Sequence, residues 1–199
     1  MLINGGASPQ DALDLAQIQG AGIIALQEVK SGIEDEFDPE SWYLHYAPFA
    51  HRDQGTAIAF KRSGFEPPQI WSMNLPGGRR VAIGYANNIL IASVHLSLHQ
   101  LVNRWQLHSV RLALEDLKKE LEEVKTTIIC GDTNIVGPCF LKDMKDAGPR
   151  AATHRTCNIF PARLDRFFIS PKSAKTTSSL LPMGKSDHHP ILVSFCNPE

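Results

Sequence analysis

The stretch Ile128-Ile129-Cys130-Gly131-Asp132-Thr133-Asn134 decides the fold, because an apolar run ends there at a glycine and polar side chains follow. Residues 128–130 are predicted to form a buried strand, and Gly131 permits a bend or a close approach of the backbone to a ligand. Alternation along the chain puts Asp132 and Asn134 on one side, so a carboxylate and an amide point into the same space. The alternative is an ordinary turn at a strand end, since Gly, Asp and Asn are common turn residues.

Two further apolar segments lead directly into polar side chains. Residues 23–26 form a short predicted strand that leads into Glu28, and residues 89–94 form another that ends at His95. Each polar residue has an ordinary structural interpretation, a surface glutamate or a hydrogen-bonded core histidine. Because polar groups follow three buried strands in the same way, the sequence favours a shared crevice at the ends of these strands.

A fourth signal comes from the C-terminal part of the chain. Asp165 interrupts the apolar and aromatic run at residues 163–170, and a charge inside such a run is costly unless it is paired. The predicted partner lies in the segment that contains Asp187 and His188, just before the last predicted strand at residues 191–195.

The remaining pattern indicates a mixed α/β sandwich formed as one domain over residues 1–199. A long amphipathic helix is predicted from Asn103 to Lys125, with leucine and valine at spacings of three and four. Residues 79–83 and 89–94 are predicted to be strands joined by a turn at Asn87-Asn88. Residues 31–54 are interpreted as a packed connection.

Composition narrows the class of partner. The formal net charge is -1 over 199 residues, which disfavours a protein that binds polyanions over its whole surface. Residues 125–199 contain ten Lys and Arg and six Asp and Glu, a net charge of +4. This part of the chain is therefore the better candidate for contact with phosphate. The four cysteines lack metal-ligand spacing and are interpreted as reduced thiols. No signal peptide or membrane span is recognisable, so a cytoplasmic location is expected.

Five ordered motifs together resemble the endonuclease/exonuclease/phosphatase superfamily. They are L-Q-E-V at 26–29, V-H-L-S at 94–97, G-D-T-N at 131–134, R-L-D-R-F-F at 163–168 and S-D-H-H-P at 186–190. The V-H-L-S motif resembles the branch that contains pancreatic-type deoxyribonuclease and the bacterial sphingomyelinases, in which a histidine occupies this position. The resemblance implies an α+β fold, a four-layer α/β sandwich in which two mixed sheets pack face to face with helices outside.

The resemblance also implies a site for Mg²⁺, with Mn²⁺ as a possible substitute. Glu28 corresponds to the principal ligand, Asp187 to the carboxylate that completes the site, and Asn4 to a further ligand near the first strand. One departure is that the usual first asparagine of this pattern falls on Leu2. Either the chain begins late, or another residue serves as the ligand, or metal binding is weakened. A family member that binds its substrate without cleaving it is therefore a further alternative.

The catalytic roles that the resemblance implies fit phosphodiester hydrolysis, which needs a positioned base, an acid and a hard cation. Asp132 would orient or deprotonate the attacking water, and Asn134 would hold a phosphate oxygen or that water. His188 would contact the scissile phosphate, either stabilising its charge or moving a proton, while Asp165 fixes its orientation. His95 is the second histidine, on the leaving-group side.

The expected activity is that of a monomeric, DNA-directed endonuclease or exonuclease, since the short chain leaves little room for insertions that recognise lipid or inositol headgroups. Arg104 and Arg163 are the predicted substrate contacts among several arginines that could bind phosphates. A phosphatase or a phospholipase acting on a small or lipid substrate is the alternative. A membrane enzyme would need an exposed apolar or basic lip, and the sequence shows no obvious one besides Trp42-Tyr43, for which a core role is expected.

Overall fold

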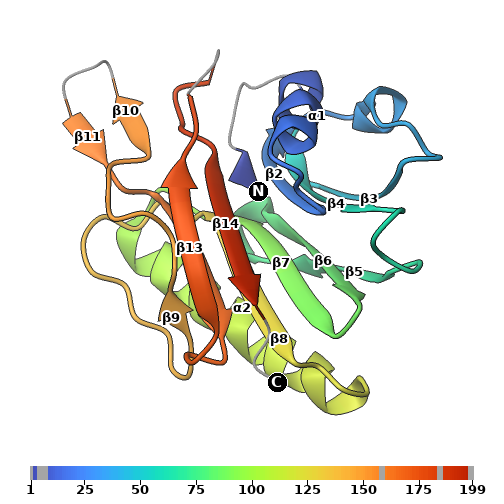
Figure 1. Ribbon diagram of the computed structural model, residues 1–199. Helices are drawn as coiled ribbons and strands as arrows, with labels where there is room; N and C mark the ends of the chain where they lie inside the picture. Colours follow the sequence, from blue (N-terminus) through green and yellow to red (C-terminus); the bar gives the residue numbers. More distant parts are fainter. Residues whose placement is uncertain (1, 4–8, 157–159, 183–185, 197–199) are drawn as a thin grey trace.

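The computed structural model of this chain describes residues 2–3, 9–156, 160–182 and 186–196. Two six-stranded sheets make up most of it (Figure 1). The first sheet contains β1 (Leu2–Ile3), β2 (Ile23–Val29), β3 (Trp42–Pro48), β4 (Gly55–Lys61), β13 (Lys175–Leu180) and β14 (Ile191–Cys196). The second contains β5 (Gln69–Asn74), β6 (Arg80–Ala86), β7 (Ile89–His95), β8 (Thr126–Asp132), β9 (Lys145–Asp146) and β12 (Asp165–Ser170). A separate hairpin is formed by β10 (His154–Thr156) and β11 (Phe160–Ala162).

The strand order is β13-β14-β1-β2-β4-β3 in the first sheet and β5-β6-β7-β8-β12-β9 in the second. Both sheets are mixed, because β1 runs parallel to β2 and β7 runs parallel to β8 while the other pairs are antiparallel. The β7–β8 register places His95 opposite Asp132, and the β8–β12 register places Asp132 opposite Asp165. Backbone pairing alone therefore brings His95, Asp132 and Asp165 together at one end of these three strands.

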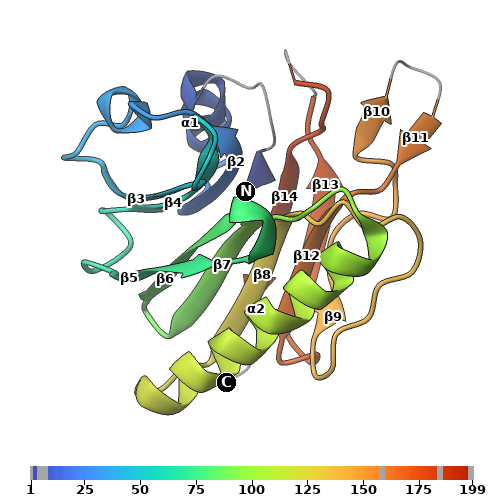
Figure 2. The same cartoon turned by 180° about the vertical axis from the view of Figure 1, so that it is seen from behind.

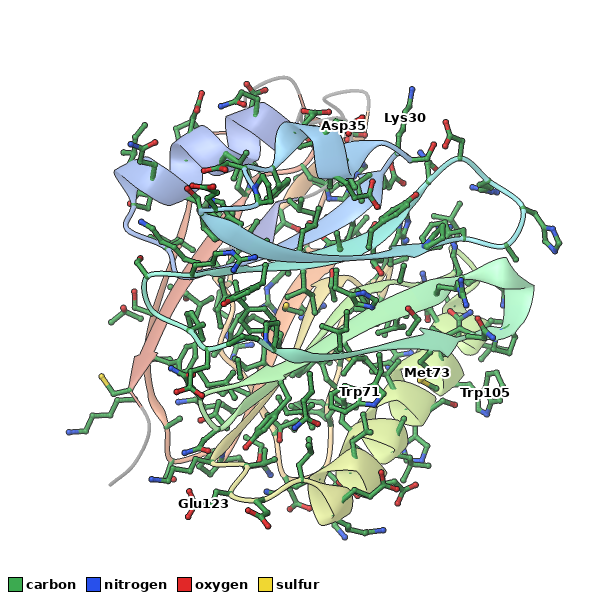
Figure 3. All side chains as sticks on the ribbon, turned by 90° about the vertical axis from the view of Figure 1, so that its right-hand side faces the viewer. Lys30, Asp35, Trp71, Met73, Trp105 and Glu123 are labelled. Carbon is green, nitrogen blue, oxygen red and sulfur yellow. The ribbon has the colours of Figure 1, made fainter. Side chains whose placement is uncertain are left out.

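Helices complete the four layers. The helix α1 (Pro9–Ile18) covers the outer face of the first sheet, and α2 (Gln100–Glu120) lies across the outer face of the second (Figure 2). Viewed from the side, the two helices lie on opposite sides of the paired sheets, and Trp71 and Met73 of β5 lie on the side of α2 (Figure 3). Two short 3-10 helices, Ile33–Glu36 and Pro76–Gly78, lie in connections. The predicted fold class is confirmed.

Three apolar clusters correspond to the three interfaces between these layers. Ile58, Ile91 and Ile128 belong to the cluster between the sheets, whereas Ala16 of α1 and Leu107 of α2 belong to the two outer clusters. Burial of this apolar surface is the main stabilising contribution to the fold. Among the described residues, no helix is long and apolar enough to cross a membrane.

Gly131 has the tightest backbone environment in β8. Its φ is 137°, and a Cβ atom placed there would lie 2.0 Å from the carbonyl oxygen of Val94 on the neighbouring strand. At this glycine the backbone closely approaches strand β7. Only glycine lets β7 and β8 pair closely at the point where both strands end in polar side chains.

Several predicted elements are confirmed, with shifted bounds. The long helix spans Gln100–Glu120 rather than 103–125, because the segment after Glu120 turns away and the cap residue Leu121 has extended backbone angles. The hairpin turn at Asn87-Asn88 is confirmed between β6 and β7.

The interpretation of residues 31–54 as a connection is wrong for Trp42–Pro48, which form β3 at the edge of the first sheet. The strand's apolar and polar residues do not alternate, and its pairing with β4 supplies the hydrogen bonds that hold it. Trp42 is buried, as expected for a core role.

Candidate active site

Glu28 is aimed by an irregularity in β2. The pairing of β2 with β4 shifts register between Gln27 and Val29, and Glu28 itself has a φ of 57°. A bulge of this kind turns a side chain out of the regular alternation, and positive φ in a non-glycine residue marks a position held by its surroundings. The carboxylate oxygen Oε1 of Glu28 lies 3.4 Å from Nε2 of His95, and the Glu28 side chain is partly open to solvent.

Asp132 and Asn134 form a closed hydrogen-bonded unit at the end of β8. The backbone N–H of Asn134 donates to Oδ1 of Asp132 at 2.8 Å, and its Nδ2 donates to Oδ2 at 3.1 Å. Nδ2 also donates to the carbonyl of Leu96, while Gln100 and Asn103 of α2 donate to the carbonyl of Asn134. The side chains share one side, as predicted, and the φ of 51° at Asn134 makes this close pairing possible.

The environment of Asp132 opposes its ionisation. Burial, helped by the nearby negative charges of Asp165 and Glu28, raises the pKa of Asp132 to about 7. The positive charge of His188 and the N–H of Asn134 act in the opposite direction. A carboxyl group that titrates near neutral pH can accept a proton from water and can be returned to its charged form.

Asp165 and His188 form the predicted buried pair. Nδ1 of His188 donates to Oδ2 of Asp165 at 2.8 Å, and Asp165 is 0% exposed. Burial alone would lower the pKa of His188, but the hydrogen bond and charge of Asp165, with the charges of Asp132 and Asp187, raise it to about 9. His188 is therefore an imidazolium ion at neutral pH.

A buried threonine holds this pair in position. Oγ1 of Thr153 accepts hydrogen bonds from the backbone N–H groups of Leu164 and Asp165, at 3.1 and 3.0 Å. The carbonyl of the same threonine accepts from the N–H of His189 at 2.7 Å. Thr153 thus ties the start of β12 to the His188 segment. No sequence signal marks Thr153, since a lone threonine in an irregular stretch resembles any loop residue.

His95 lies in the same site but carries no charge. Burial, with the positive charges of Arg79, His188 and Arg52, lowers its pKa to about 3. Its Nε2 lies 3.4 Å from Glu28 and 3.7 Å from Oδ2 of Asp132, and its Nδ1 has no hydrogen-bond partner among the described residues.

Arg79, one of the several arginines that could bind phosphates, lies near Glu28 and Asp132. Burial and the charge of Arg52 lower the pKa of Arg79, whereas the carboxylates of Glu28 and Asp132 act in the opposite direction. The guanidinium carbon lies 4.9 Å from the centre of the Phe49 ring, and that ring packs against His95 with centroids 5.9 Å apart. Phe49 therefore contacts both the guanidinium of Arg79 and the ring of His95, which lies beside Glu28 and Asp132.

Asp187 lies beside a histidine that the sequence analysis did not single out. Oδ2 of Asp187 is 3.4 Å from Nε2 of His154, and the rings of His154 and His188 are 4.4 Å apart. No contact among the described residues brings Asp187 directly to Glu28, the other predicted metal ligand. Asn4, the third predicted ligand, lies outside the described residues.

The two predicted substrate contacts, Arg104 and Arg163, make structural bonds of their own. Arg163 binds both carboxylate oxygens of Asp146 at 2.5 and 2.7 Å and also donates to backbone carbonyls. Both terminal nitrogens of Arg104 donate to the carbonyl of Pro138 at 3.2 Å. The structure does not bring either guanidinium into contact with the catalytic cluster. The sequence could not reveal this for Arg163, because Asp146 lies in β9, a strand of two residues that no sequence pattern marks.

An exposed apolar surface adjoins this region. It consists of side chains at the start of α2 and in the loop after β8, namely Leu98, Leu101, Trp105, Val136 and Phe140. Hydrogen bonds of Gln100 to the carbonyl of Asn134 and the N–H of Val136 join the two segments, and Phe140 is 89% exposed. Exposed apolar side chains therefore lie on two segments that hydrogen bonds join beside the site. The five residues are too far apart in sequence for the patch to be recognised.

Comparison with known proteins places these motifs in a family. The model of the endonuclease/exonuclease/phosphatase family matches residues 3–188. The chain belongs to this family. Members of the endonuclease/exonuclease/phosphatase family are hydrolases that act on phosphoester bonds, and they generally depend on divalent metals. Among curated proteins, no sequence matches this chain.

Solved structures share the fold of this family member at low sequence identity. An endonuclease/exonuclease/phosphatase from Bacteroides vulgatus is 14% identical with a TM-score of 0.72, covering 99% of this chain and 97% of that one. Truncated TDP2 from Caenorhabditis elegans is 15% identical with a TM-score of 0.71, covering 96% and 92%. TDP2 from D. rerio, solved with a single-strand DNA product, is 16% identical with a TM-score of 0.66, covering 98% and 97%.

Proposed function

We propose that this protein is a Mg²⁺-dependent phosphodiester hydrolase that acts on DNA. The observation that supports the proposal most strongly is that a buried cation, His188, lies near a buried carboxyl group that can act as a base, Asp132. His188 is held as a cation by Asp165, while Asp132 is a carboxyl group with a pKa near neutrality. A cation can hold the phosphate, and a base of this strength can remove a proton from the attacking water.

The donor set at Glu28 fits a hard cation. Glu28 offers a partly solvated carboxylate, and the charges of Glu28 and Asp165 are close enough to Asp132 to raise the pKa of that carboxyl group. Mg²⁺ is commonly held by one or two carboxylates and keeps several waters, which this half-open position allows. Glu28 would be the principal ligand, with Asp187 and Asn4 as the further ligands implied by the family resemblance. The ion would supply charge that offsets the anionic phosphodiester.

The side chains of this chain then have separate tasks. Asp132 accepts the proton of the attacking water, and Asn134 orients Asp132 through its two hydrogen bonds. His188 donates a hydrogen bond to a non-bridging oxygen of the scissile phosphate, and Asp165 maintains its charge and orientation. His95, as a neutral imidazole beside Glu28, positions that carboxylate, and the cationic His188 supplies the proton that the leaving oxygen takes up.

Three observations favour DNA as the substrate. The part of the chain from residue 125 onward carries a net charge of +4. Trp105 and Phe140 present exposed aromatic rings on the apolar surface, and unpaired bases stack on such rings. The D. rerio TDP2 that shares this fold was solved with a single-strand DNA product.

The same apolar surface supports a second candidate, a phosphodiesterase that acts on lipid headgroups. Leu98, Leu101 and Val136 are exposed on the same two segments as the two aromatic residues, and exposed apolar patches mark membrane or partner contacts. The two functions differ in salt dependence. Cleavage of DNA should fall steeply as salt is raised, because backbone contacts release counterions, whereas hydrolysis in neutral phosphatidylcholine vesicles should change little.

The test is conversion of supercoiled plasmid to the nicked form with and without Mg²⁺, for the wild-type protein, Glu28→Ala and His188→Ala. The matched control is His108→Ala, which removes an exposed histidine on α2. Nicking that requires metal, persists in the control and disappears in both site variants is the expected result. Nicking that survives in both site variants would overturn the assignment, and vesicle hydrolysis without any nicking would favour the lipid candidate.

A further inference from the structure

We infer that His154, Asp187 and His188 form a binding site for a zinc-class divalent cation, which shares only Asp187 with the Mg²⁺ site proposed at Glu28. One ligand atom from each of these three side chains lies within 4.8 Å of the others. Two imidazoles and one carboxylate are a donor set of borderline cations such as Zn²⁺, whereas Mg²⁺ prefers oxygen ligands alone. The chemical class of the ion therefore differs from that expected at Glu28.

The distances suit a small tetrahedral ion. Nε2 of His154 and Oδ2 of Asp187 are 3.4 Å apart, which is long for a hydrogen bond between charged groups. Two ligands bound about 2.0–2.1 Å from a tetrahedral ion are separated by about 3.3–3.4 Å. The two side chains thus already stand at the spacing that coordination requires.

His188 is oriented as a metal ligand by its other nitrogen. Its Nδ1 bonds to Oδ2 of Asp165 at 2.8 Å, so Nε2 is on the side of the ring away from that carboxylate. Zinc-bound histidines almost always donate their second N–H to a carboxylate or carbonyl, which fixes the ring and raises its basicity. Asp165, at 0% exposed, is such a partner for His188.

Backbone contacts hold the two histidines together before any ion arrives. His154 and His188 form an antiparallel β-bridge, and the N–H of His189 donates to the carbonyl of Thr153 at 2.7 Å. The β10–β11 hairpin and the beginning of β14 lie at the same end of the molecule (Figure 1). A site on paired backbone segments keeps its geometry better than one on independent loops.

Zinc at this position would inhibit hydrolysis, an inference that rests on the proposed function. The ion would displace the proton from Nε2 of His188, the atom proposed to contact the phosphate, and would also bind Asp187. Binding itself does not depend on that proposal, so the two can fail separately.

Binding is tested by calorimetric titration of metal-free protein with Zn²⁺ alone, and by the visible absorption of Co²⁺ in its place. One site per chain with a tetrahedral Co²⁺ spectrum is expected. Asp187→Asn and His154→Gln should each weaken Zn²⁺ at least about tenfold, and Asp165→Asn should weaken it by about 10- to 100-fold. Asp187 is 65% exposed on its side chain, so its replacement leaves the fold intact.

Two controls separate this site from adventitious binding. His108→Gln and Cys196→Ser remove an exposed histidine and an exposed thiol that could bind zinc elsewhere, and neither should change the affinity. Zn²⁺ affinity that is unchanged in His154→Gln and Asp187→Asn, or no binding by the folded wild-type protein, would overturn the site. Zn²⁺ binding without any hydrolytic activity would instead support the site and refute the proposed function.

Inhibition is measured as the Zn²⁺ concentration that halves the Mg²⁺-dependent rate, relative to each variant's own rate without zinc. His154→Gln should raise that concentration at least about tenfold, in step with its loss of affinity. Equal inhibition of the variant and the wild-type protein would contradict the inference that this site mediates it.

Discussion

His188 and His95 are two buried imidazoles in one site with opposite behaviour. They are 8% and 3% exposed, yet the pKa of His188 is raised to about 9 and that of His95 is lowered to about 3. Burial lowers the pKa of both rings. The difference is that His188 has Asp165 at hydrogen-bond distance, 2.8 Å away. The carboxylate of Glu28 lies farther from His95, at 3.4 Å, and the positive charges of Arg79 and Arg52 lower the pKa of His95 further.

The comparison teaches that a bonded partner, rather than depth in the protein, decides which histidine carries charge. The site can therefore hold a cation for the phosphate at His188 and a neutral ring beside Glu28. Four substitutions test this division in order of decreasing expected effect.

The largest effect is expected from Asp165→Asn, which removes the negative charge from the partner of His188. The pKa of His188 should fall, because burial would then be opposed only by the charges of Asp132 and Asp187. In the Ser-His-Asp proteases the equivalent change costs about 10⁴ in kcat, and we expect a loss of roughly 10³- to 10⁴-fold here. Asp143→Asn, an exposed aspartate, is the matched control in a steady-state assay. A loss below tenfold in a folded Asp165 variant would show that His188 does not need its charge.

Gly131→Ala should break the strand register that places His95 opposite Asp132. The new Cβ would meet the Val94 carbonyl at 2.0 Å, and the φ of 137° is strained for alanine. We expect a loss of about 3 kcal/mol or more in unfolding free energy, measured by urea denaturation. Gly32→Ala has a positive φ but no atom within 4 Å, so it should cost only about 1 kcal/mol. Equal losses in the two variants would mean that the contact with Val94 is unimportant.

Asp132→Asn should abolish the base while stabilising the protein. Activity should fall roughly 100-fold or more. Because ionised Asp132 is costly when buried, the neutral variant should melt about 2–4 °C higher at pH 8, corresponding to about 1 kcal/mol. This cost develops as the pH rises from the unfolded-state value near 3.8 to the folded pKa of about 7, so the gain should shrink as the pH is lowered towards 4. A lower melting temperature at pH 8 would contradict a raised pKa for Asp132.

The smallest effect is expected from Arg79→Gln, which removes one of the positive charges that keep His95 neutral. The pKa of His95 should rise, and KM for DNA should increase roughly 3- to 10-fold, near the 1 kcal/mol of a partly exposed charge contact. Arg80→Gln is the control, since its Nε donates to Asn74. An unchanged pKa of His95 in the Arg79 variant would show that burial alone keeps it neutral.

Much of the fold was predictable because its central strands are apolar runs. The segments that end at Glu28, His95 and Asp132 are nearly all buried, and α2 shows a helical period. Strand β13 was not predictable, because Lys175–Leu180 is mostly polar and exposed and takes its conformation from pairing with β14. Strand β5 is similar at the edge of the second sheet.

The site was predictable where one residue follows a strand, and not where contacts come from irregular segments. The Asp165–His188 pair was expected from a charge within an apolar strand. Thr153 and His154 were not, since their roles depend on a hairpin that brings them to His188. The sequence predicts a substrate contact for Arg163, because no motif identifies Asp146 as the partner of this arginine.

The most direct test of the account is an NMR pH titration of the imidazoles of His188 and His95 in the metal-free protein, with resonances assigned from His188→Gln and His95→Gln. His188 should titrate near pH 9, and His95 should remain neutral from pH 5 to pH 9. A neutral His188 at pH 7, or a His95 that gains a proton near pH 6.5, would contradict the division of charge on which the proposed hydrolysis depends.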